Sequence, residues 1–362
     1  MSPRVVADDA IPHLDAAFSE LTRVRGTEIT AEHLLDADAL VVRSVTRVDA
    51  ALLKGTNVRF VGSATAGIDH VDVTALARSG ITFAHAPGCN ARAVVEYVLA
   101  ATLGHSELRG PVGVVGFGQI GRRLVTALRR LGCEVWVCDP PRAESADRTE
   151  TFLSLSALLE RCTTVSFHVP RIRDGRHRTR HLLSAEGLRR LPRGALVLNT
   201  SRGDVVDNAA LHAWLDAGRG EAVLDVWEGE PNLRWPLLSH PRVRIATPHI
   251  AGYTVEGKAR GTAMIHGAFC RTFGIRPSFD ASRVLPAAMP LPTQSDAGAV
   301  LRRVHALGTT DPATRALLEQ PAQDRPAAFE ALRRGYAFRR ELSAHDPTLG
   351  AGALWDALDG LS

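Results

Sequence analysis

Several common motifs and segments are missing from the 362-residue sequence, and each absence excludes a class of protein. No apolar run approaches the ~20 residues that a membrane-spanning helix needs. Residues 1–9 carry two acids where a signal peptide would have its apolar core. The five cysteines are scattered without a CxxC pair, and no HExxH motif occurs. We therefore expect a cytoplasmic protein with reduced thiols, no metal and no membrane contact.

Positive charge is carried almost entirely by arginine, and the formal net charge is +4. The densest run, residues 171–180, holds five arginines but no aromatic side chain that would stack on a base. A solvated loop accounts for such a run. We therefore expect no nucleic-acid partner.

The order of strand-like and helical segments predicts two α/β layers. Apolar runs at residues 4–7, 39–43 and 59–62 alternate with helical stretches, and residues 90–105 suit a connecting helix. Strands that alternate with helices imply a parallel sheet. A second series of six strand candidates follows, at residues 112–115, 134–138, 164–168, 195–199, 222–225 and 243–246.

These patterns predict an α/β chain with two Rossmann-like, doubly wound parallel sheets. Residues 1–95 and 251–285 form the expected substrate-binding domain, because the helical stretch after Ile250 should return to the first sheet. Residues 96–250 form the expected nucleotide-binding domain. The proline-rich segment LPAAMPLPTQSD then leads into residues 286–362, which we expect to form a small α+β domain.

A glycine-rich turn follows the first strand of the second series. Residues 116–121, GFGQIG, have the GxGxxG spacing. The first glycine permits a tight turn, the second lets the backbone approach a pyrophosphate, and the third allows close helix packing. The amides of the following helix can face the phosphates. The sequence therefore predicts a dinucleotide site at Gly116, Gly118, Gln119, Ile120 and Gly121.

The next strand ends in an acid, Asp139, which lies 18 residues after Gly121. A carboxylate at this place can accept both ribose hydroxyls and would repel a 2′-phosphate. The sequence therefore favours NAD over NADP.

Three polar residues follow later strands of the same series: Arg202, Glu230 and His249. Open α/β sheets bind their ligands at these strand ends. A guanidinium can bind a carboxylate, and histidine can take a hydroxyl proton near neutral pH. A carboxylate at the far nitrogen would fix the tautomer. Each residue alone is compatible with a surface role, but together they predict oxidation of a secondary alcohol.

In this order the motifs resemble the D-2-hydroxyacid dehydrogenase family: GxGxxG, an arginine before glycine, a glutamate in D-x-x-x-x-E-P, and P-H-I-A-G. The resemblance covers roughly residues 1 to 285. It implies Arg202, Glu230 and His249 as the catalytic residues and Asp225 near the nicotinamide. The other cofactor contacts that it implies are Val169, Thr200, Ser201 and Gly252.

Other stretches, among them VVRSVTRVD, APGCNARAVVEYV and TPHIAGYTVEGKARGT, resemble family members that oxidise 4-phospho-D-erythronate in vitamin B6 biosynthesis. This resemblance implies Ser44, Thr65 and Tyr253 as substrate contacts. It also implies a C-terminal dimerisation domain, and hence a homodimer. Because a phosphorylated hydroxy acid is anionic at both ends, we infer Arg43 from its charge as a further contact.

Two other functions stay open at this point. A dehydrogenase for 3-phosphoglycerate or a simple 2-hydroxy acid would carry the same three residues, although residues 286–362 lack the βαββαβ alternation of a regulatory domain. A non-enzymatic NAD-binding scaffold would also keep the fold. It would need a partner groove or a flexible tail, and the sequence shows no obvious motif of that kind.

Overall fold

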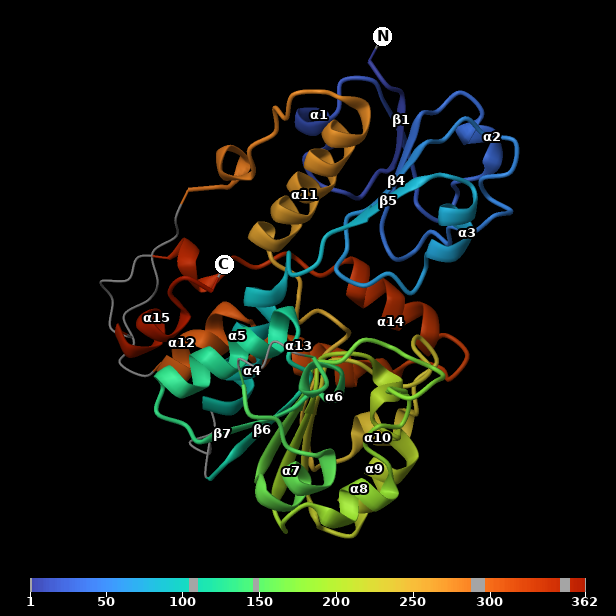
Figure 1. Ribbon diagram of the computed structural model, residues 1–362. Helices are drawn as coiled ribbons and strands as arrows, with labels where there is room; N and C mark the ends of the chain where they lie inside the picture. Colours follow the sequence, from blue (N-terminus) through green and yellow to red (C-terminus); the bar gives the residue numbers. More distant parts are fainter. Residues whose placement is uncertain (1, 104–109, 146–149, 288–296, 346–351, 362) are drawn as a thin grey trace. The chain divides into compact units, whose positions relative to one another are not determined.

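The computed structural model describes residues 2–103, 110–145, 150–287, 297–345 and 352–361. The chain divides into two compact units, each with its own parallel sheet (Figure 1). Unit 1 comprises residues 1–90 and 253–287, and unit 2 comprises residues 91–252 and 288–362. The predicted α/β fold class is confirmed by these two sheets.

Unit 1 is built on five parallel strands in the order β2-β1-β3-β4-β5. The strands are β1 (Val5–Asp8), β2 (Leu21–Val24), β3 (Ala39–Val42), β4 (Phe60–Ser63) and β5 (Thr82–His85). The helices are α1 (Leu14–Ala17), α2 (Ala31–Leu34), α3 (Val73–Arg78) and α11 (Val255–Phe273), followed by the 3-10 helix η2 (Ala281–Val284).

Successive residues of the unit 1 strands are buried on opposite faces of the sheet. Val5 and Phe60 pack with Ile265 of α11 on one face. Val6 packs with Leu34 of α2 on the other face. A parallel sheet covered on both faces needs apolar residues at every strand position. This is why its central strands are continuous apolar runs in the sequence.

Unit 2 is built on six parallel strands in the order β11-β10-β9-β8-β6-β7. A parallel bridge between Val137 and Phe152 extends the sheet beyond β7. The strand order reverses between β6 and β8, which is where open α/β sheets bind ligands. The strands are β6 (Val112–Val115), β7 (Val135–Cys138), β8 (Thr164–Phe167), β9 (Ala195–Asn199), β10 (Gly220–Leu224) and β11 (Val243–Ala246).

Helices cover this sheet, and four of them join one core with the strands through Leu158, Leu188, Leu211 and Leu237. They are α4 (Ala91–Leu103), α5 (Gln119–Arg130), α6 (Pro140–Ala143), α7 (Leu155–Arg161), α8 (Ala185–Arg190), α9 (Asn208–Asp216) and α10 (Trp235–Ser239), with the 3-10 helix η1 (Gly203–Val205).

The C-terminal segment packs onto unit 2 (Figure 1). Helix α12 (Ala297–Val304) lies on α4, α13 (Leu307–Arg315) on β11, and α15 (Gly352–Leu358) on α5. The remaining elements are η3 (Ala316–Glu319), α14 (Arg325–Arg334) and η4 (Leu342–Ala344).

We expected strands in this segment, but its described residues form helices and no β-strand. The physical reason is the pattern of apolar residues. Leu317 and Phe329, for example, are buried in the core of unit 2, whereas their neighbours are partly exposed, as in amphipathic helices. A separate dimerisation domain at residues 286–362 stays a prediction.

No helix in the described part of the chain combines the length and the apolarity that a bilayer crossing requires.

Candidate active site

The glycine turn between β6 and α5 has the geometry that a dinucleotide site needs. Gly116 has φ +96°, and a Cβ there would lie 2.5 Å from the carbonyl oxygen of His168. A Cβ on Gly121 would lie 1.8 Å from the carbonyl oxygen of Gly116. A Cβ on Gly118 would have no atom within 4 Å. Two glycines are therefore required by packing, and the middle one borders open space.

The first turn of α5 leaves its backbone amides available to that space. Gly118 is the N-cap, and no side chain caps the helix. The amides of a helix N-terminus attract anions. The side-chain oxygen of Gln119 accepts hydrogen bonds from Arg122 (2.6 Å) and Arg123 (2.8 Å). Because the side chain of Gln119 is engaged, we expect Gln119, like Ile120, to contact a cofactor through its backbone amide.

Asp139 lies at the carboxyl end of β7, beside the glycine turn. Its Oδ2 accepts a hydrogen bond from the amide of Phe117 at 2.6 Å. Its Oδ1 accepts one from the amide of Arg142 at 3.1 Å and so caps α6. The carboxylate thus fixes the glycine turn from the neighbouring strand. Its predicted contact with a ribose stays a prediction.

The segment after β8 supports the same turn. His168 is buried, with Nε2 2.8 Å from the Ser166 hydroxyl and Nδ1 3.5 Å from the Thr200 hydroxyl. Burial lowers the pKa of His168 to about 3, so its ring is neutral at physiological pH. The Cγ1 of Val169 lies close enough that a Cβ on Gly116 would approach it to 2.9 Å. His168 and Val169 therefore shape the floor of the turn.

The three predicted catalytic residues follow three neighbouring strands of one sheet. Arg202 follows β9, Glu230 follows β10, and His249 follows β11. Nδ1 of His249 lies 2.8 Å from Oε2 of Glu230. The other oxygen of Glu230 accepts a hydrogen bond from the amide of Trp227 at 2.7 Å. The fold therefore pairs the predicted base with the predicted acid.

The charge state of Glu230 decides which nitrogen of His249 carries the proton. Burial opposes ionisation of Glu230, but His249, Arg333 and the amide of Trp227 outweigh it and hold the pKa of this carboxyl below its usual value. An ionised carboxylate can only accept hydrogen bonds. Nδ1 of His249 must therefore donate, which leaves Nε2 as the basic nitrogen.

The backbone of His249 adopts the left-handed conformation, with φ +60°. Asp225 holds it there, because its carbonyl accepts the His249 amide at 2.7 Å. The Asp225 carboxylate accepts the amides of Ile250 (2.7 Å) and Ala251 (3.0 Å) and the hydroxyl of Thr247 (2.7 Å). Asp225 is therefore the support of the histidine turn. Its predicted place near the nicotinamide stays a prediction, as does that of Gly252.

Arg202 lies on a loop that packs directly against the loop of Glu230. A Cβ on Gly203 would lie 1.9 Å from the carbonyl carbon and oxygen of Trp227, so the two backbones touch. Nη1 of Arg202 donates to the carbonyl of Ser201 at 2.8 Å. Ser201 in turn donates to Asn199 at 2.8 Å. The loop that carries the predicted substrate clamp is therefore ordered by its own hydrogen bonds.

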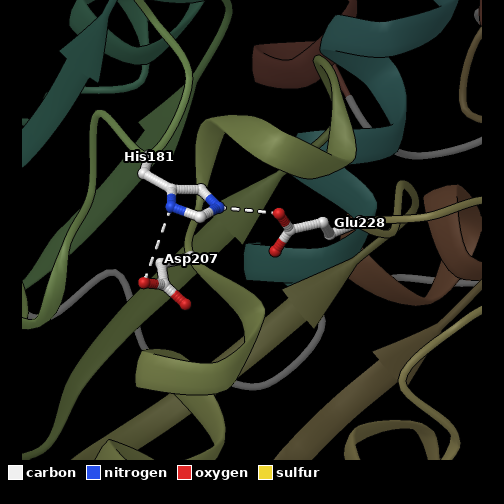
Figure 2. A group of neighbouring side chains, drawn as sticks. All are labelled: His181, Asp207 and Glu228. Atoms are coloured by element: carbon white, nitrogen blue, oxygen red, sulfur yellow. Dashed lines mark hydrogen bonds and ion pairs between the residues drawn. The ribbon is translucent and has the colours of Figure 1, made fainter.

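A charged cluster joins the same two loops. Figure 2 shows the His181 ring between two carboxylates, with Nε2 2.7 Å from Oε1 of Glu228 and Nδ1 3.7 Å from Oδ2 of Asp207. The backbone amide of Glu228 donates to the side chain of Asn208 at 3.2 Å. A metal ion binds one nitrogen of an imidazole, yet the carboxylates lie at different nitrogens. The cluster therefore has the geometry of an imidazole that bridges two carboxylates, and the expected lack of a metal stays a prediction.

Two of the predicted substrate residues in unit 1 already have partners. The guanidinium of Arg43 binds the buried carboxylate of Asp8 through two hydrogen bonds of 3.0 and 3.1 Å. The hydroxyl of Thr65 donates to the carbonyl of Gly67 at 2.8 Å and lies 2.7 Å from that of Ser63. The pair with Asp8 offsets much of the charge from which Arg43 was inferred.

The other two predicted contacts differ in their surroundings. Ser44 is exposed after the end of β3. Tyr253 precedes α11, and the Nζ of Lys258 lies 4.4 Å from the centre of its ring. Sequence reasoning missed Lys258, which lies five residues after Tyr253 in the first turn of α11. The roles of Arg43, Ser44, Thr65 and Tyr253 stay predictions.

Curated relatives match nearly the whole chain. The erythronate-4-phosphate dehydrogenase of Azotobacter vinelandii (strain DJ / ATCC BAA-1303) is 47% identical over 360 residues, which covers 94% of this chain and 93% of that protein. The erythronate-4-phosphate dehydrogenase of Edwardsiella ictaluri (strain 93-146) is 45% identical, with the same coverage. The chain belongs to the erythronate-4-phosphate dehydrogenase family. The family resemblance predicted from the motifs is thereby confirmed.

The nucleotide-binding half matches on its own as well. Residues 96–251 match the family model described as "D-isomer specific 2-hydroxyacid dehydrogenase, NAD binding domain". The predictions of an NAD-dependent dehydrogenase and of NAD as its cofactor are confirmed by this match and by the relatives.

Solved structures share the fold at lower sequence identity. The D-lactate dehydrogenase of Aquifex aeolicus, solved with NAD and lactic acid, has a TM-score of 0.62 and 22% identity over 75% of this chain and 95% of that one. The NAD-bound 3-phosphoglycerate dehydrogenase of Entamoeba histolytica has a TM-score of 0.64 and 22% identity over 76% of this chain and 96% of that one. These likenesses support the assignment of the fold.

Proposed function

We propose that this chain oxidises 4-phospho-D-erythronate at its 2-hydroxyl to (3R)-3-hydroxy-2-oxo-4-phosphooxybutanoate in vitamin B6 biosynthesis. The substrate comes from the names of relatives that match 94% of the chain. The observation that supports the chemistry most directly is the 2.8 Å bond between His249 and an ionised Glu230 at the carboxyl ends of the sheet.

His249 is the general base of this proposal. Its Nδ1 donates to Glu230, so Nε2 is the nitrogen that takes the proton from the 2-hydroxyl. The imidazolium that forms is stabilised by the Glu230 carboxylate, which also keeps the ring in one orientation. In the reverse direction the same nitrogen returns the proton to the 2-oxo group.

Arg202 binds the substrate carboxylate, because a guanidinium presents paired donors that match two carboxylate oxygens. The glycine turn and the first turn of α5 hold the cofactor, through the open space at Gly118 and the uncapped amides. Bound NAD supplies the acceptor for the hydride that leaves carbon 2. Asp139 accepts the ribose hydroxyls, and Ser44, Thr65, Tyr253 and Arg43 contact the phosphorylated end of the substrate.

The test is a direct assay of the purified protein with 4-phospho-D-erythronate and either added NAD or a 2-oxo acid as acceptor. We expect oxidation of this acid to exceed that of 3-phosphoglycerate and of D-lactate in the same assay. Preference for 3-phosphoglycerate would replace the substrate assignment. NAD binding without turnover of any 2-hydroxy acid would favour a non-enzymatic scaffold.

The role of His249 is tested by His249→Ala. General base catalysis contributes roughly 10²- to 10⁴-fold to a rate, so we expect kcat to fall by that factor. The affinity for NADH should persist, because the glycine turn is untouched. Turnover equal to that of the parent would refute the assignment of His249 as the base.

The proposal also includes a cytoplasmic homodimer that binds neither a membrane nor nucleic acid. Residues 325–342, whose sequence contains FEALRRGYAFRREL, carry the resemblance to a dimerisation domain. Light scattering of the purified protein should give twice the chain mass of 38.9 kDa. A monomer at assay concentrations would contradict this part of the proposal.

A further inference from the structure

An arginine of the C-terminal segment reaches the turn that carries His249. Arg339 is 8% exposed, and its Nη1 donates to the carbonyl of Ile250 at 3.1 Å. Its Nη2 donates to the carbonyls of Ala251 (2.5 Å) and of Ala93 on α4 (3.2 Å). All of these groups belong to unit 2. One guanidinium therefore binds the two carbonyls that directly follow the catalytic histidine.

The same turn is held on its other side by Asp225. The Asp225 carboxylate accepts the amides of Ile250 and Ala251, the same two residues whose carbonyls bind Arg339. The Asp225 carboxylate therefore fixes the N–H groups of this turn, and the Arg339 guanidinium fixes its carbonyl groups. His249 needs such support, because the left-handed conformation that it adopts is unfavourable for a residue other than glycine.

Arg339 is itself fixed by the core of unit 2. The amide of Leu342 donates to both oxygens of Glu96, at 3.0 and 3.1 Å. Glu96 is fully buried on α4 and forms an ion pair with Arg92 at 2.9 Å. Because both Glu96 and Ala93 belong to α4, this helix sets the position of the residues around Arg339. The guanidinium is thus pre-organised for the carbonyls that it binds.

We propose that Arg339 is a positioning residue that sets the orientation of His249 through the carbonyls of residues 250 and 251. The C-terminal segment then serves the active site of its own chain, in addition to any part in dimerisation. The inference rests on the proposed function, in which His249 is the base. An arginine is required because its planar fork binds several carbonyls at fixed angles, whereas the single ammonium of lysine cannot hold them all.

The experiment compares Arg339→Ala and Arg339→Lys with the matched control Arg130→Ala. Arg130, at the end of α5, also ties the C-terminal segment down, since its guanidinium donates to the carbonyls of Asp356 (3.2 Å) and Asp359 (2.7 Å). It lies on none of the loops of the candidate site. For each variant, kcat, KM, the dissociation constant of NADH and the thermal unfolding midpoint are measured.

We expect Arg339→Ala to lower kcat by ~10- to 100-fold, because a small misplacement of a catalytic group has an effect of this size. The NADH dissociation constant should stay that of the parent. Arg339→Lys should give an intermediate kcat, and low-millimolar guanidinium should partly restore kcat of Arg339→Ala. Arg130→Ala should lower the unfolding midpoint and leave kcat unchanged.

Three results would overturn the proposal. One is an Arg339→Ala variant that loses stability as Arg130→Ala does but keeps the parental kcat. Another is a lost kcat that neither lysine nor guanidinium restores, which would indicate a general structural role. If Arg339→Ala does not fold, a fully active Arg339→Lys would be the contradicting result.

The two proposals fail in different ways. Lack of turnover of 4-phospho-D-erythronate by the parent enzyme contradicts the proposed substrate. The Arg339 proposal is judged by the ratio of variant to parental kcat on whichever 2-hydroxy acid the parent oxidises.

Discussion

Replacement of Glu230 by glutamine removes the charge that faces His249, the proposed base, while it keeps nearly the same shape. The glutamine oxygen can still accept the Nδ1 proton, so the orientation of the ring is partly preserved. What is lost is the attraction between a carboxylate and the imidazolium that forms in the reaction. The variant therefore isolates the electrostatic part of the pair.

The magnitude follows from the geometry. With a contact of 2.8 Å the two charges are centred roughly 4 Å apart, and their attraction is about 4 kcal/mol at an effective dielectric constant of 20 and about 1 kcal/mol in water. The side chains of Glu230 and His249 are 16% and 28% exposed, so the value lies between these limits. Since 1.36 kcal/mol is tenfold in rate, we expect kcat to fall by ~5- to 1000-fold.

The assay is steady-state oxidation of 4-phospho-D-erythronate, with Glu228→Gln as the matched control. Glu228 lies on the same loop, but it binds His181 and not His249 (Figure 2). We expect Glu228→Gln to reduce stability and to change kcat much less than Glu230→Gln. A kcat of Glu230→Gln within a factor of three of the parental value, or equal effects of the two variants, would refute the reasoning.

Stability provides an independent measurement of the same pair. The pKa of Glu230 is lowered in the folded protein, so its ionised form contributes stability above the unfolded value of 4.5. That contribution is lost as the pH falls from 4.5 through the lower folded value. The unfolding free energy of the parent should therefore exceed that of Glu230→Gln at neutral pH, and the difference should shrink below pH 4.5. A difference that does not change with pH would contradict the assignment.

Two further predictions concern the cofactor half. Gly118→Ala should fold with the parental unfolding midpoint but bind NADH more weakly, whereas Gly121→Ala should be destabilised by ~2–3 kcal/mol, because its Cβ would meet the Gly116 carbonyl at 1.8 Å. Equal midpoints of the two variants in thermal unfolding would contradict this. The folded pKa of His168 is about 3 against 6.5 unfolded, so its burial destabilises the fold progressively below pH 6.5. Urea unfolding at pH 6.5 and 4.5 should show that His168→Gln loses about 2–3 kcal/mol less than the parent over this interval.

The sequence predicted the central strands of both sheets but missed two edge strands. The six strands of unit 2 lie within two residues of their predicted ends, because buried parallel strands are continuous apolar runs. The missed strands, β2 and β5, lie at the two edges of the unit 1 sheet. Their residues are largely exposed or half-buried, in the segments LTRV and TFAH. An edge strand needs less apolar surface, so the pattern that identifies a strand is weak there.

The residues of the candidate site could be predicted from spacing, whereas their supports could not. Arg202, Glu230 and His249 each follow a strand within a few residues, and the parallel sheet brings those strand ends together. Arg339 and His181 make contacts across long sequence separations, one buried and one part-buried, that no local pattern marks. Both belong to arginine- and histidine-containing stretches that resemble ordinary solvated segments in the sequence.

Three buried polar residues of unit 2, Tyr97, Thr247 and Asp225, are connected by hydrogen bonds that lead to the turn of His249. Burial raises the pKa of Tyr97 on α4, so its hydroxyl stays neutral, and it lies 2.6 Å from the hydroxyl of Thr247. Thr247 has one proton and donates it to Asp225 at 2.7 Å, so Tyr97 must donate to Thr247.

The direction of each hydrogen bond from Tyr97 through Thr247 to Asp225 is therefore fixed. A buried network whose hydrogen bonds are satisfied is rigid. Asp225 ends this network by holding the amides of residues 250 and 251, whose carbonyls bind Arg339. The turn of His249, the proposed base, is thus supported from α4, from the end of β10 and from the C-terminal segment together. It follows that a mutation of Tyr97 or Arg339, which lie away from the glycine turn, should lower kcat while the dissociation constant of NADH stays that of the parent.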